Sequence, residues 1–554
     1  MNFFSKAWLH SPRAAVFVIA CLITIFYAPL FGGYWLGDDF VNLLISHDLA
    51  QDGKLLSGAL DYFTKGTSSA GSMYRPLQMA TLLGNYAIAG AYYPGWFGVN
   101  FVLHLANAIL IFYVVRAFAA RFSTHNQAIP VLAPLLAALA FALAPTLAEG
   151  VFWVSARADA CVTLLSLLSL LAWVHSAKPQ QGRAVWWFPA LLVPALLIKE
   201  SAAVLPLQMA LVMAALGPAM RRQHFFALAL SALLVCVFFV LRWSLFGHAF
   251  GVYVAPGSAA QGVTFTLLWG ALQSVAPWWQ ALTEATPTAA LVYLVLLCGL
   301  ALWACVRVRG AYARISIALL GAAGGLALAT LVNLGGLAAT GEGGRLTYSP
   351  ICWLAVAAGV ALAGAISGKR VPWLPHALLA SLIVCGGIVL HSIIRQAGEA
   401  QSTTRAIAQS ISTWSANNTG HAMLIIPEMM NFVVATRNAQ GGLAMPPVQP
   451  LGLAHRVMPT LVSELPTRYD QYRNGMATQL AANPPVRFDE KSIATMLSPA
   501  DASWPTEFLC WPASARSLQK LSPPQASGRE AWVNDLRRSL LETEELCIPA
   551  SYGK

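Results

Sequence analysis

The chain has 554 residues, of which 57% are hydrophobic and only 10% are charged, and its mean hydropathy is +0.61. Soluble globular proteins average about 25% charged residues, so this composition excludes that class and predicts an all-α polytopic membrane protein. The net charge is +11. In a membrane protein such an excess usually holds cytoplasmic loops against anionic lipid, so we expect membrane lipids, and no nucleic acid, among its partners.

A helix needs about 20 apolar residues to cross a bilayer. Segments that meet or approach this requirement number eleven: 14–33, 98–118, 129–146, 159–176, 184–198, 201–218, 224–243, 288–306, 313–333, 347–366 and 373–394. The first follows Lys6 and Arg13. It is too long for a signal-peptide core of about 7–15 residues, so we expect a retained helix with a cytoplasmic N-terminus.

The basic residues support this count. Every turn that it places inside is basic: Arg116, Arg121, Lys178, Arg183, Arg221, Arg222, Arg307, Arg309, Arg314, Lys369 and Arg370. A twelfth span at 264–282 would move the last inner turns outside, against the positive-inside rule. We therefore interpret 264–282, which ends in Pro277-Trp278-Trp279, as a helix on the outer surface. The pattern predicts a multi-pass protein of the cell inner membrane.

Two domains are predicted. Residues 1–395 form the transmembrane module, and residues 396–554 are polar, with several proline clusters. An odd number of spans puts this second region outside the cytoplasm. Within it, 422–426 is typical of a short buried strand, and 530–546 is typical of an amphipathic helix. We expect a small extracytoplasmic domain of α+β class.

The cysteines give one further constraint. Seven of the nine lie in apolar stretches, where they act as small hydrophobic residues. Only Cys510 and Cys547 lie in the polar C-terminal region, where an oxidising compartment permits a single disulfide. No Cys/His spacing typical of a zinc site appears.

The first outer segment, 34–97, begins with two adjacent carboxylates, Asp38 and Asp39. A carboxylate at the boundary of the hydrocarbon is costly, so its presence there favours a functional site. The alternative is a solvated loop that ends a helix, since charges commonly flank membrane helices.

Tyr74 and Arg75 precede an amphipathic stretch, 77–90, which is predicted to lie in the plane of the membrane interface. A guanidinium forms forked hydrogen bonds to phosphate oxygens, so Arg75 is a candidate for holding a phosphate. The alternative is an interfacial arginine that extends its head into water.

Asn100, His104 and Asn107 recur at i, i+4 and i+7, so they share one helix face. The favoured interpretation is a stripe of hydrogen bonds between helices. His104 is also a candidate for ordering the loops or binding substrate.

Glu149, Arg157 and Asp159 form a second charged cluster at the start of a very apolar helix. They are candidates for ordering the outer loops or for binding substrate. Asp159 alternatively caps its helix through the helix dipole.

Lys199 and Glu200 occupy the next outer turn, where they form either a local ion pair or a site in which Lys199 holds a phosphate as a point charge. Glu342 and Arg345 flank two glycines. This turn is either flexible or shaped for close approach of a ligand.

The charges predicted on the outer side are of both signs, unlike those on the inner side. The outer set is Asp38, Asp39, Arg75, Glu149, Arg157, Asp159, Lys199, Glu200, Arg242, Glu342 and Arg345. Nucleotide donors are not available outside the inner membrane, so group transfer there needs a donor carried by lipid. We expect cations to hold a lipid-linked phosphate sugar and an aspartate to deprotonate an acceptor hydroxyl.

The chain resembles a known family, the GT-C glycosyltransferases. Within it, the similarity is greatest to the protein O-mannosyltransferases of the branch that carries tetratricopeptide repeats and to the bacterial relatives of that branch. The similar segments, in chain order, are 74–77 with Asn85, Tyr86 and Gly90; 100–108; 141–159; 199–200; and 345–350. The run 141–159, which ends in W-V-S-A-R-A-D, is the most specific.

The resemblance implies a polyprenyl-phosphate sugar donor and a catalytic role for the acidic pair, carried over onto Asp38 and Asp39. The expected reaction is a single displacement that inverts the sugar C1, with Asp38 as general base and Asp39 holding the loop or helping to position substrate. Arg75, Lys199 and Arg345 are the candidates for the donor phosphate. No cofactor is required; a divalent metal bound by the acidic pair is compatible with the family, but no spacing demands one.

The chain departs from the family in several places. The repeats are absent, and residues 396–554 stand in their place. Ala144 occupies a position where the family often has His, and Leu346 one where it often has Tyr. The acceptor therefore stays open among protein, glycan and lipid, and so does the identity of the sugar.

Two rival functions remain. A transporter or flippase of lipid-linked saccharide would have charges near the bilayer midplane and broken helices in pairs. A non-catalytic envelope scaffold would use the C-terminal region to bind a partner. The crowding of charges at the outer helix ends favours the transferase.

Overall fold

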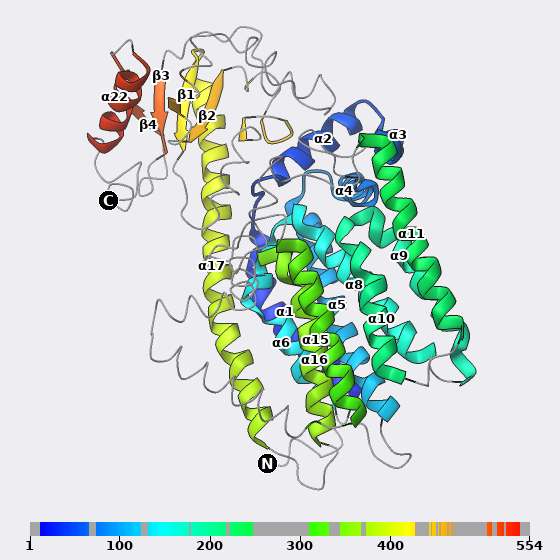
Figure 1. The fold of residues 1–554 in the computed structure, drawn as a ribbon. Helices are drawn as coiled ribbons and strands as arrows, with labels where there is room; N and C mark the ends of the chain where they lie inside the picture. The colour runs from blue at the N-terminus through cyan, green and yellow to red at the C-terminus, as the bar shows by residue number, and fades with distance from the viewer. Residues whose placement is uncertain are drawn as a thin grey trace.

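A computed structural model of the chain describes residues 11–65, 74–122, 131–176, 179–217, 222–247, 308, 310–331, 344–366, 373–426, 507–511, 518–525 and 528–542, with short pieces between 443 and 469. The predicted surface helix 264–282 and the predicted span 288–306 lie outside the described residues. The described part is mainly helical and ends in a small sheet (Figure 1).

In the described residues, seven helices are long and apolar enough to cross a membrane, so the chain is a multi-pass membrane protein. They are Pro12–Gly32 (α1 Pro12–Tyr27 with η2 Ala28–Gly32), Tyr93–Phe122 (α5), Val154–Ser176 (η4 Val154–Ala156 with α8 Arg157–Ser176), Gln181–Ile198 (η5 Pro179–Trp186 with α9 Trp187–Ile198), Arg222–Phe246 (α11), Gly344–Gly364 (η9 Gly344–Thr347 with α16 Tyr348–Ile366) and His376–Asn417 (α17 Trp373–Asn417).

The eleven predicted spans are not all reproduced as full spans. The predicted span 129–146 ends early: α6 (Leu132–Ala142) is followed by η3 (Pro145–Leu147) and α7 (Ala148–Phe152), bent by 50°, and the pair counts as an eighth span only if taken together. Pro145 supplies no N–H to continue α6, which explains the break. The predicted span 201–218 is the shorter apolar helix Glu200–Leu216, made of η6 (Glu200–Val204) and α10 (Leu205–Leu216).

The helix α5 lies at the centre of the bundle and packs against α1, α4, α6, α8 and α16 (Figure 1). A second layer places α15 (Gly310–Leu331) between α10 and α16. Gly359 of α16 shows how closely the helices approach, because a Cβ there would lie 2.6 Å from the Ala137 Cβ and 2.8 Å from a Val115 methyl. Small residues at helix crossings are the usual way in which membrane helices pack closely.

Short helices cover one end of the bundle. They are α2 (Asp39–Gln51), α3 (Leu55–Lys65) and α4 (Pro76–Ala89), at the end to which the upper part of α11 also reaches (Figure 1). The predicted amphipathic stretch 77–90 corresponds to α4, which buries Met79, Leu82 and Leu83. The irregular segments η3, α7 and η9 pack on one another, and η6 packs on α9, α10 and α15.

The C-terminal region stands on the long helix α17. At 1.5 Å per residue its 45 residues extend about 68 Å, more than twice the roughly 30 Å hydrocarbon thickness. It runs without a break through residue 395, the predicted boundary between the two domains. The composition changes there, but both sides of the boundary favour helix.

A four-stranded sheet follows, in the order β2 (Val457–Leu461), β1 (Ala422–Ile426), β3 (Glu507–Cys510), β4 (Gln519–Leu521). Strand β1 pairs in parallel with β2 and β3, and β4 is antiparallel to β3. One face packs on α22 (Arg529–Glu542) through Met423, Ile425 and Trp532, and the other packs toward α17 through Leu424 and Ile411.

The predicted strand 422–426 has the same bounds as β1, and α22 covers most of the predicted helix 530–546. Cys510 is disulfide-bonded. Its expected partner, Cys547, lies outside the described residues.

Candidate functional site

The acidic pair lies on a turn whose backbone is tightly fixed. Trp35 and Leu36 are buried, and the Trp153 indole Nε1 donates to the Leu36 carbonyl at 3.1 Å. Gly37 then adopts φ 54°, a left-handed conformation that glycine takes without steric cost. The chain therefore reverses just before Asp38, and α2 begins at Asp39.

The two aspartates have different environments. Asp39 is buried, and its Oδ1 accepts from Ser155 N at 2.8 Å and from Ser155 Oγ at 2.6 Å. Its Oδ2 accepts from Leu36 N at 3.3 Å. Burial raises the pKa of Asp39 to about 7, although these hydrogen bonds oppose the rise. Asp38 is only partly buried. Asp39 thus fastens the first outer segment to the 153–157 segment, while its neighbour keeps access to solvent.

Arg157 fixes the same segment from within. It is 1% exposed, and it donates hydrogen bonds to neutral acceptors. It donates to Asn85 Oδ1 at 2.7 Å and to Asn100 Oδ1 at 3.1 Å, and to the carbonyls of Thr81 and Trp96 at 3.2 and 3.3 Å. These bonds join α4, α5 and α8 through one buried side chain.

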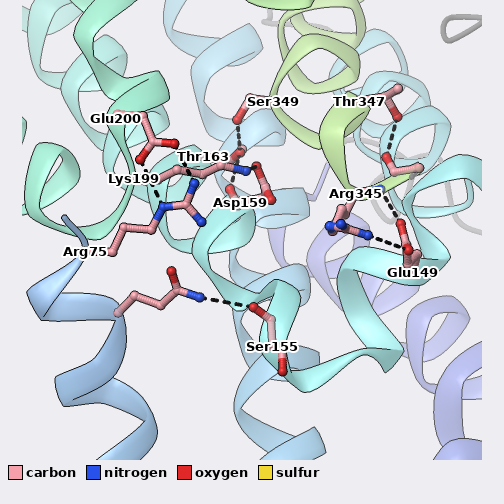
Figure 2. Close-up of polar contacts among 12 residues, drawn as sticks. Arg75, Glu149, Ser155, Asp159, Thr163, Lys199, Glu200, Arg345, Thr347 and Ser349 are labelled. Carbon is pink, nitrogen blue, oxygen red and sulfur yellow. Dashed lines mark hydrogen bonds and ion pairs between the residues drawn. The ribbon is translucent and has the colours of Figure 1, made fainter. Parts of the chain in front are cut away.

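Three ion pairs connect segments that are far apart in sequence (Figure 2). Lys199 Nζ lies 2.6 Å from Asp159 Oδ1, and both side chains are buried. Arg75 contacts Glu200 through two hydrogen bonds, of 2.9 and 2.5 Å. Lys199 therefore pairs with Asp159 and not with its neighbour in sequence, contrary to the local-pair alternative.

The third ion pair holds the last predicted cluster. Arg345 Nη1 donates to Glu149 Oε1 at 2.8 Å, and the Arg345 backbone N–H donates to Glu149 Oε2 at 3.0 Å. The guanidinium also lies over the Trp153 ring, 4.3 Å from its centroid. Gly344 permits this approach, since a Cβ there would collide with the Thr146 carbonyl. Glu342 lies outside the described residues.

The charges around Glu200 act on one another. Burial favours the neutral acid, but the positive charges of Arg75 and Lys199 outweigh it and lower the pKa of Glu200 to about 2. Burial lowers the pKa of Lys199, against the opposing effect of Asp159. Arg242 of α11 is buried and interacts electrostatically with both Glu200 and Arg75. Cations from three separate helices or loops therefore meet around one carboxylate.

Three other residues singled out in the sequence, His104, Asn107 and Tyr74, make contacts outside these ion pairs. His104 hydrogen-bonds to the Tyr348 hydroxyl at 2.8 Å and to the Ala142 carbonyl at 3.1 Å, both buried in the bundle. Asn107 donates to the Ala160 carbonyl, so this stripe links helices, as the favoured interpretation predicted. Tyr74 donates to the Phe63 carbonyl at 3.0 Å and supports the outer segment.

Sequence reasoning missed Ser155, although it is the main partner of Asp39. A lone serine in an apolar run carries no signal that could have identified it. Arg242 was noted only as an outer charge, and its position in a helix otherwise free of charge after Arg222 was the available signal. Gln401 and Arg405 of α17 were also missed, because they lie beyond the predicted end of the last span.

The side chains suit a metal ion poorly. In the described part of the chain, no group of three or more His, Cys, Asp and Glu residues could hold one. Of the acidic pair, Asp39 already accepts hydrogen bonds on both oxygens. We therefore derive no step through a metal ion.

No protein-family model matches the chain. A stretch of 178 residues is 32% identical to the Protein O-mannosyl-transferase TMTC4 of Mus musculus and 30% identical to that of Homo sapiens. It covers 30% of this chain, and the chain spans about a quarter of those proteins' length (24%).

Two solved structures of similar outline are ArnT from Cupriavidus metallidurans bound to undecaprenyl phosphate and the archaeal oligosaccharyltransferase AglB from Archaeoglobus fulgidus in complex with an inhibitory peptide and a dolichol-phosphate. The first has TM-score 0.44 and 14% identity, over 88% of this chain and 97% of that chain. The second has TM-score 0.40 and 11% identity, over 76% and 63%. Over the matched 178 residues the chain resembles protein O-mannosyl-transferases, as its motifs predicted.

Proposed function

We propose that this chain is an integral membrane glycosyltransferase of GT-C type. It moves a hexose from a polyprenyl-phosphate donor to an acceptor hydroxyl on the extracytoplasmic face of the cell inner membrane. The acceptor is a protein, a glycan or a lipid. The similarity to O-mannosyl-transferases supports sugar transfer over transport or scaffolding.

One observation carries the proposal. Charged residues from five separate segments of the sequence make long-range contacts at a single end of the bundle. Asp39 accepts hydrogen bonds from Ser155, and three ion pairs join Arg75 to Glu200, Lys199 to Asp159 and Arg345 to Glu149. Charges at a membrane boundary are costly and persist where they pair or bind something. A network of this size next to a partly exposed carboxylate favours chemistry at that end.

In the proposed reaction Asp38 is the general base. It removes the proton from the acceptor hydroxyl while that oxygen bonds to the sugar C1. The bond from C1 to the phosphate oxygen breaks in the same step, and polyprenyl phosphate leaves with the electron pair. Attack from the face opposite the leaving group inverts C1. Asp38 is partly exposed whereas Asp39 is buried, and this difference in access favours Asp38 for the role.

Cations stabilise the departing phosphate in this scheme. Arg345 is the most accessible of the three candidates, with 26% of its side chain exposed, against 14% for Arg75 and 9% for Lys199. In the described part of the chain, Nη1 is the one side-chain nitrogen of Arg345 that donates to Glu149. Its remaining guanidinium donors suit a tetrahedral oxyanion. Lys199 and Arg75 supply positive charge from deeper positions.

The test is a strain that lacks this chain, complemented with the wild type or with Asp38→Asn. Mass spectrometry of envelope glycans, lipids and periplasmic proteins is expected to find a sugar that the wild type restores and the variant does not. If no class of molecule loses a sugar, the proposal fails. A translocation assay of lipid-linked saccharide separates the rival: loss of translocation in the variant with transfer intact would favour a transporter.

A further inference from the structure

The long helix α17 contacts the start of segment 32–38, which carries Asp38 at its end and is called here the acid-bearing turn. Arg405 Nη2 donates to the Gly32 carbonyl at 3.0 Å and also donates to the Gly33 carbonyl. Its guanidinium lies 5.3 Å from the centre of the Tyr34 ring. These contacts fall on the three residues that precede Trp35, only a few positions before Asp38.

A second contact from α17 reaches the same turn through Tyr93. Gln401 Nε2 donates to the Tyr93 hydroxyl at 2.7 Å, and that hydroxyl donates to the Phe152 carbonyl at 3.3 Å. The Tyr93 ring packs edge-on against Trp35, with centroids 5.3 Å apart. Gln401 therefore supports both the acid-bearing turn and the segment that leads to Ser155.

Gly33 shows how close this contact is. A Cβ at this position would overlap the Gln401 side chain and would lie 2.8 Å from the Leu30 carbonyl. A glycine here lets the turn lie directly against α17.

The same helix carries the C-terminal sheet. Ile411 of α17 packs in the cluster that includes Leu424 of β1, and the Trp414 indole donates to Glu507 of β3 at 3.3 Å. Gln449 donates to the Ala408 carbonyl of α17 at 2.6 Å. Nine residues separate Arg405 from Trp414, which is about 14 Å along a helix. The sheet thus braces α17 within a few turns of its contacts with the acidic pair's turn.

We propose that Gln401 and Arg405 are positioning residues that hold the turn carrying Asp38, and that the C-terminal sheet stabilises this arrangement through α17. The two residues act on the turn through their contacts with Gly32, Gly33 and Tyr93. For its kinetic consequence the inference rests on the proposed function; for its structural consequence it does not.

The first measurement is hydrogen exchange on the full-length protein in lipid nanodiscs. In Arg405→Ala, peptides covering 30–42 are expected to exchange at least about tenfold faster than in the wild type, while peptides of α22 and of the lower part of α8 are unchanged. Arg405→Lys, which keeps the charge and one donor group, is expected to be intermediate. Arg395→Ala is the matched control: this arginine lies on the same helix, is 70% exposed and pairs with Glu399.

The second measurement is the release of polyprenyl phosphate from a polyprenyl-phosphate hexose. A misplaced base slows the chemical step without weakening donor binding, and displacements of about 1 Å can cost about 100-fold. In Arg405→Ala we expect kcat to fall about tenfold or more with KM for the donor within about twofold, and partial recovery in Arg405→Lys.

The outcomes separate the two proposals. Unchanged exchange at 30–42 in Arg405→Ala, or faster exchange spread evenly over sheet and bundle, overturns the inference. A normal kcat with faster local exchange also overturns it, since the turn would then be held without consequence. A wild-type protein that releases no polyprenyl phosphate from any hexose donor counts against the proposed function, and the exchange result then decides the inference alone.

Discussion

The two ends of the helix bundle use their charges differently. At the end capped by α2, α3 and α4, the buried Lys199 and the partly buried Arg75 and Arg345 pair with carboxylates from distant segments. At the other end, Arg116 lies over Phe112, Arg222 lies over Phe226, and Arg314 donates to the Ala215 carbonyl. Within the described ranges, none of these three forms an ion pair.

The difference teaches what each kind of charge does. Single-sign, partly exposed arginines suit an end that only has to stay beside anionic lipid. Buried pairs of opposite sign are poor devices for stability, because removing both partners is often nearly neutral. Their concentration at one end therefore favours a binding or catalytic role there, and the predictions below test this contrast between the ends.

The largest effect is expected at the buried pair of Lys199 and Asp159. Lys199→Met leaves the Asp159 carboxylate buried without its cation, which costs about 3–5 kcal/mol. The double variant Lys199→Met/Asp159→Leu removes both charges and is expected to recover most of that loss. Thermal unfolding in detergent measures both. A double variant no more stable than the single one would show that the pair itself holds the fold.

A pH-dependent effect is expected at Asp39. Its folded-state pKa, about 7, is raised above the ordinary value near 3.8, so between these values the folded chain keeps a proton that the unfolded chain releases. Its contribution to stability is therefore lost as pH rises toward 7, by at most about 1.4 kcal/mol per unit, and then levels off.

Asp39→Asn removes this titration. The stability of the wild type relative to the variant is expected to fall between pH 5 and pH 7 and to stay constant above about pH 8, measured as the difference in thermal midpoint. A difference independent of pH would mean that Asp39 stays ionised when folded.

The smallest effect is expected at the opposite end. Arg116→Gln removes a partly exposed guanidinium 5.6 Å from the centre of the Phe112 ring, a contact worth about 0.5–1 kcal/mol at most. Thermal unfolding is expected to change little, and polyprenyl phosphate release not at all. Loss of activity in this variant would remove the contrast between the ends.

The helices were largely predictable because their signal is local. Continuous apolar stretches identified most of the observed spans, and the short apolar run 422–426 identified β1. The break at Pro145 was not anticipated, since apolar composition continues through it and only the missing N–H ends α6. The continuation of α17 past residue 395 was also missed, because polar residues on an exposed helix resemble a polar domain.

For the candidate site, the sequence predicted which charges lie together but not which ones pair. Lys199 and Glu200 are adjacent in sequence, yet each pairs with a residue of another segment. Ser155 and Asp39 are 116 positions apart, and nothing in their local sequence links them. The contact between Ser155 and Asp39 depends on the packing of α2 against η4, which hydropathy does not encode. The split between Asp38 and Asp39 likewise required the turn at Gly37.

The most direct test of the account is the rate at which the purified full-length protein releases polyprenyl phosphate from a panel of polyprenyl-phosphate hexoses, mannose included, with a membrane extract as the source of acceptors. We expect Asp38→Asn to lower this rate about 100-fold or more, the usual contribution of a general base, with the thermal midpoint unchanged. Release by Asp38→Asn at the wild-type rate would contradict the account, because the partly exposed carboxylate would then have no part in the reaction.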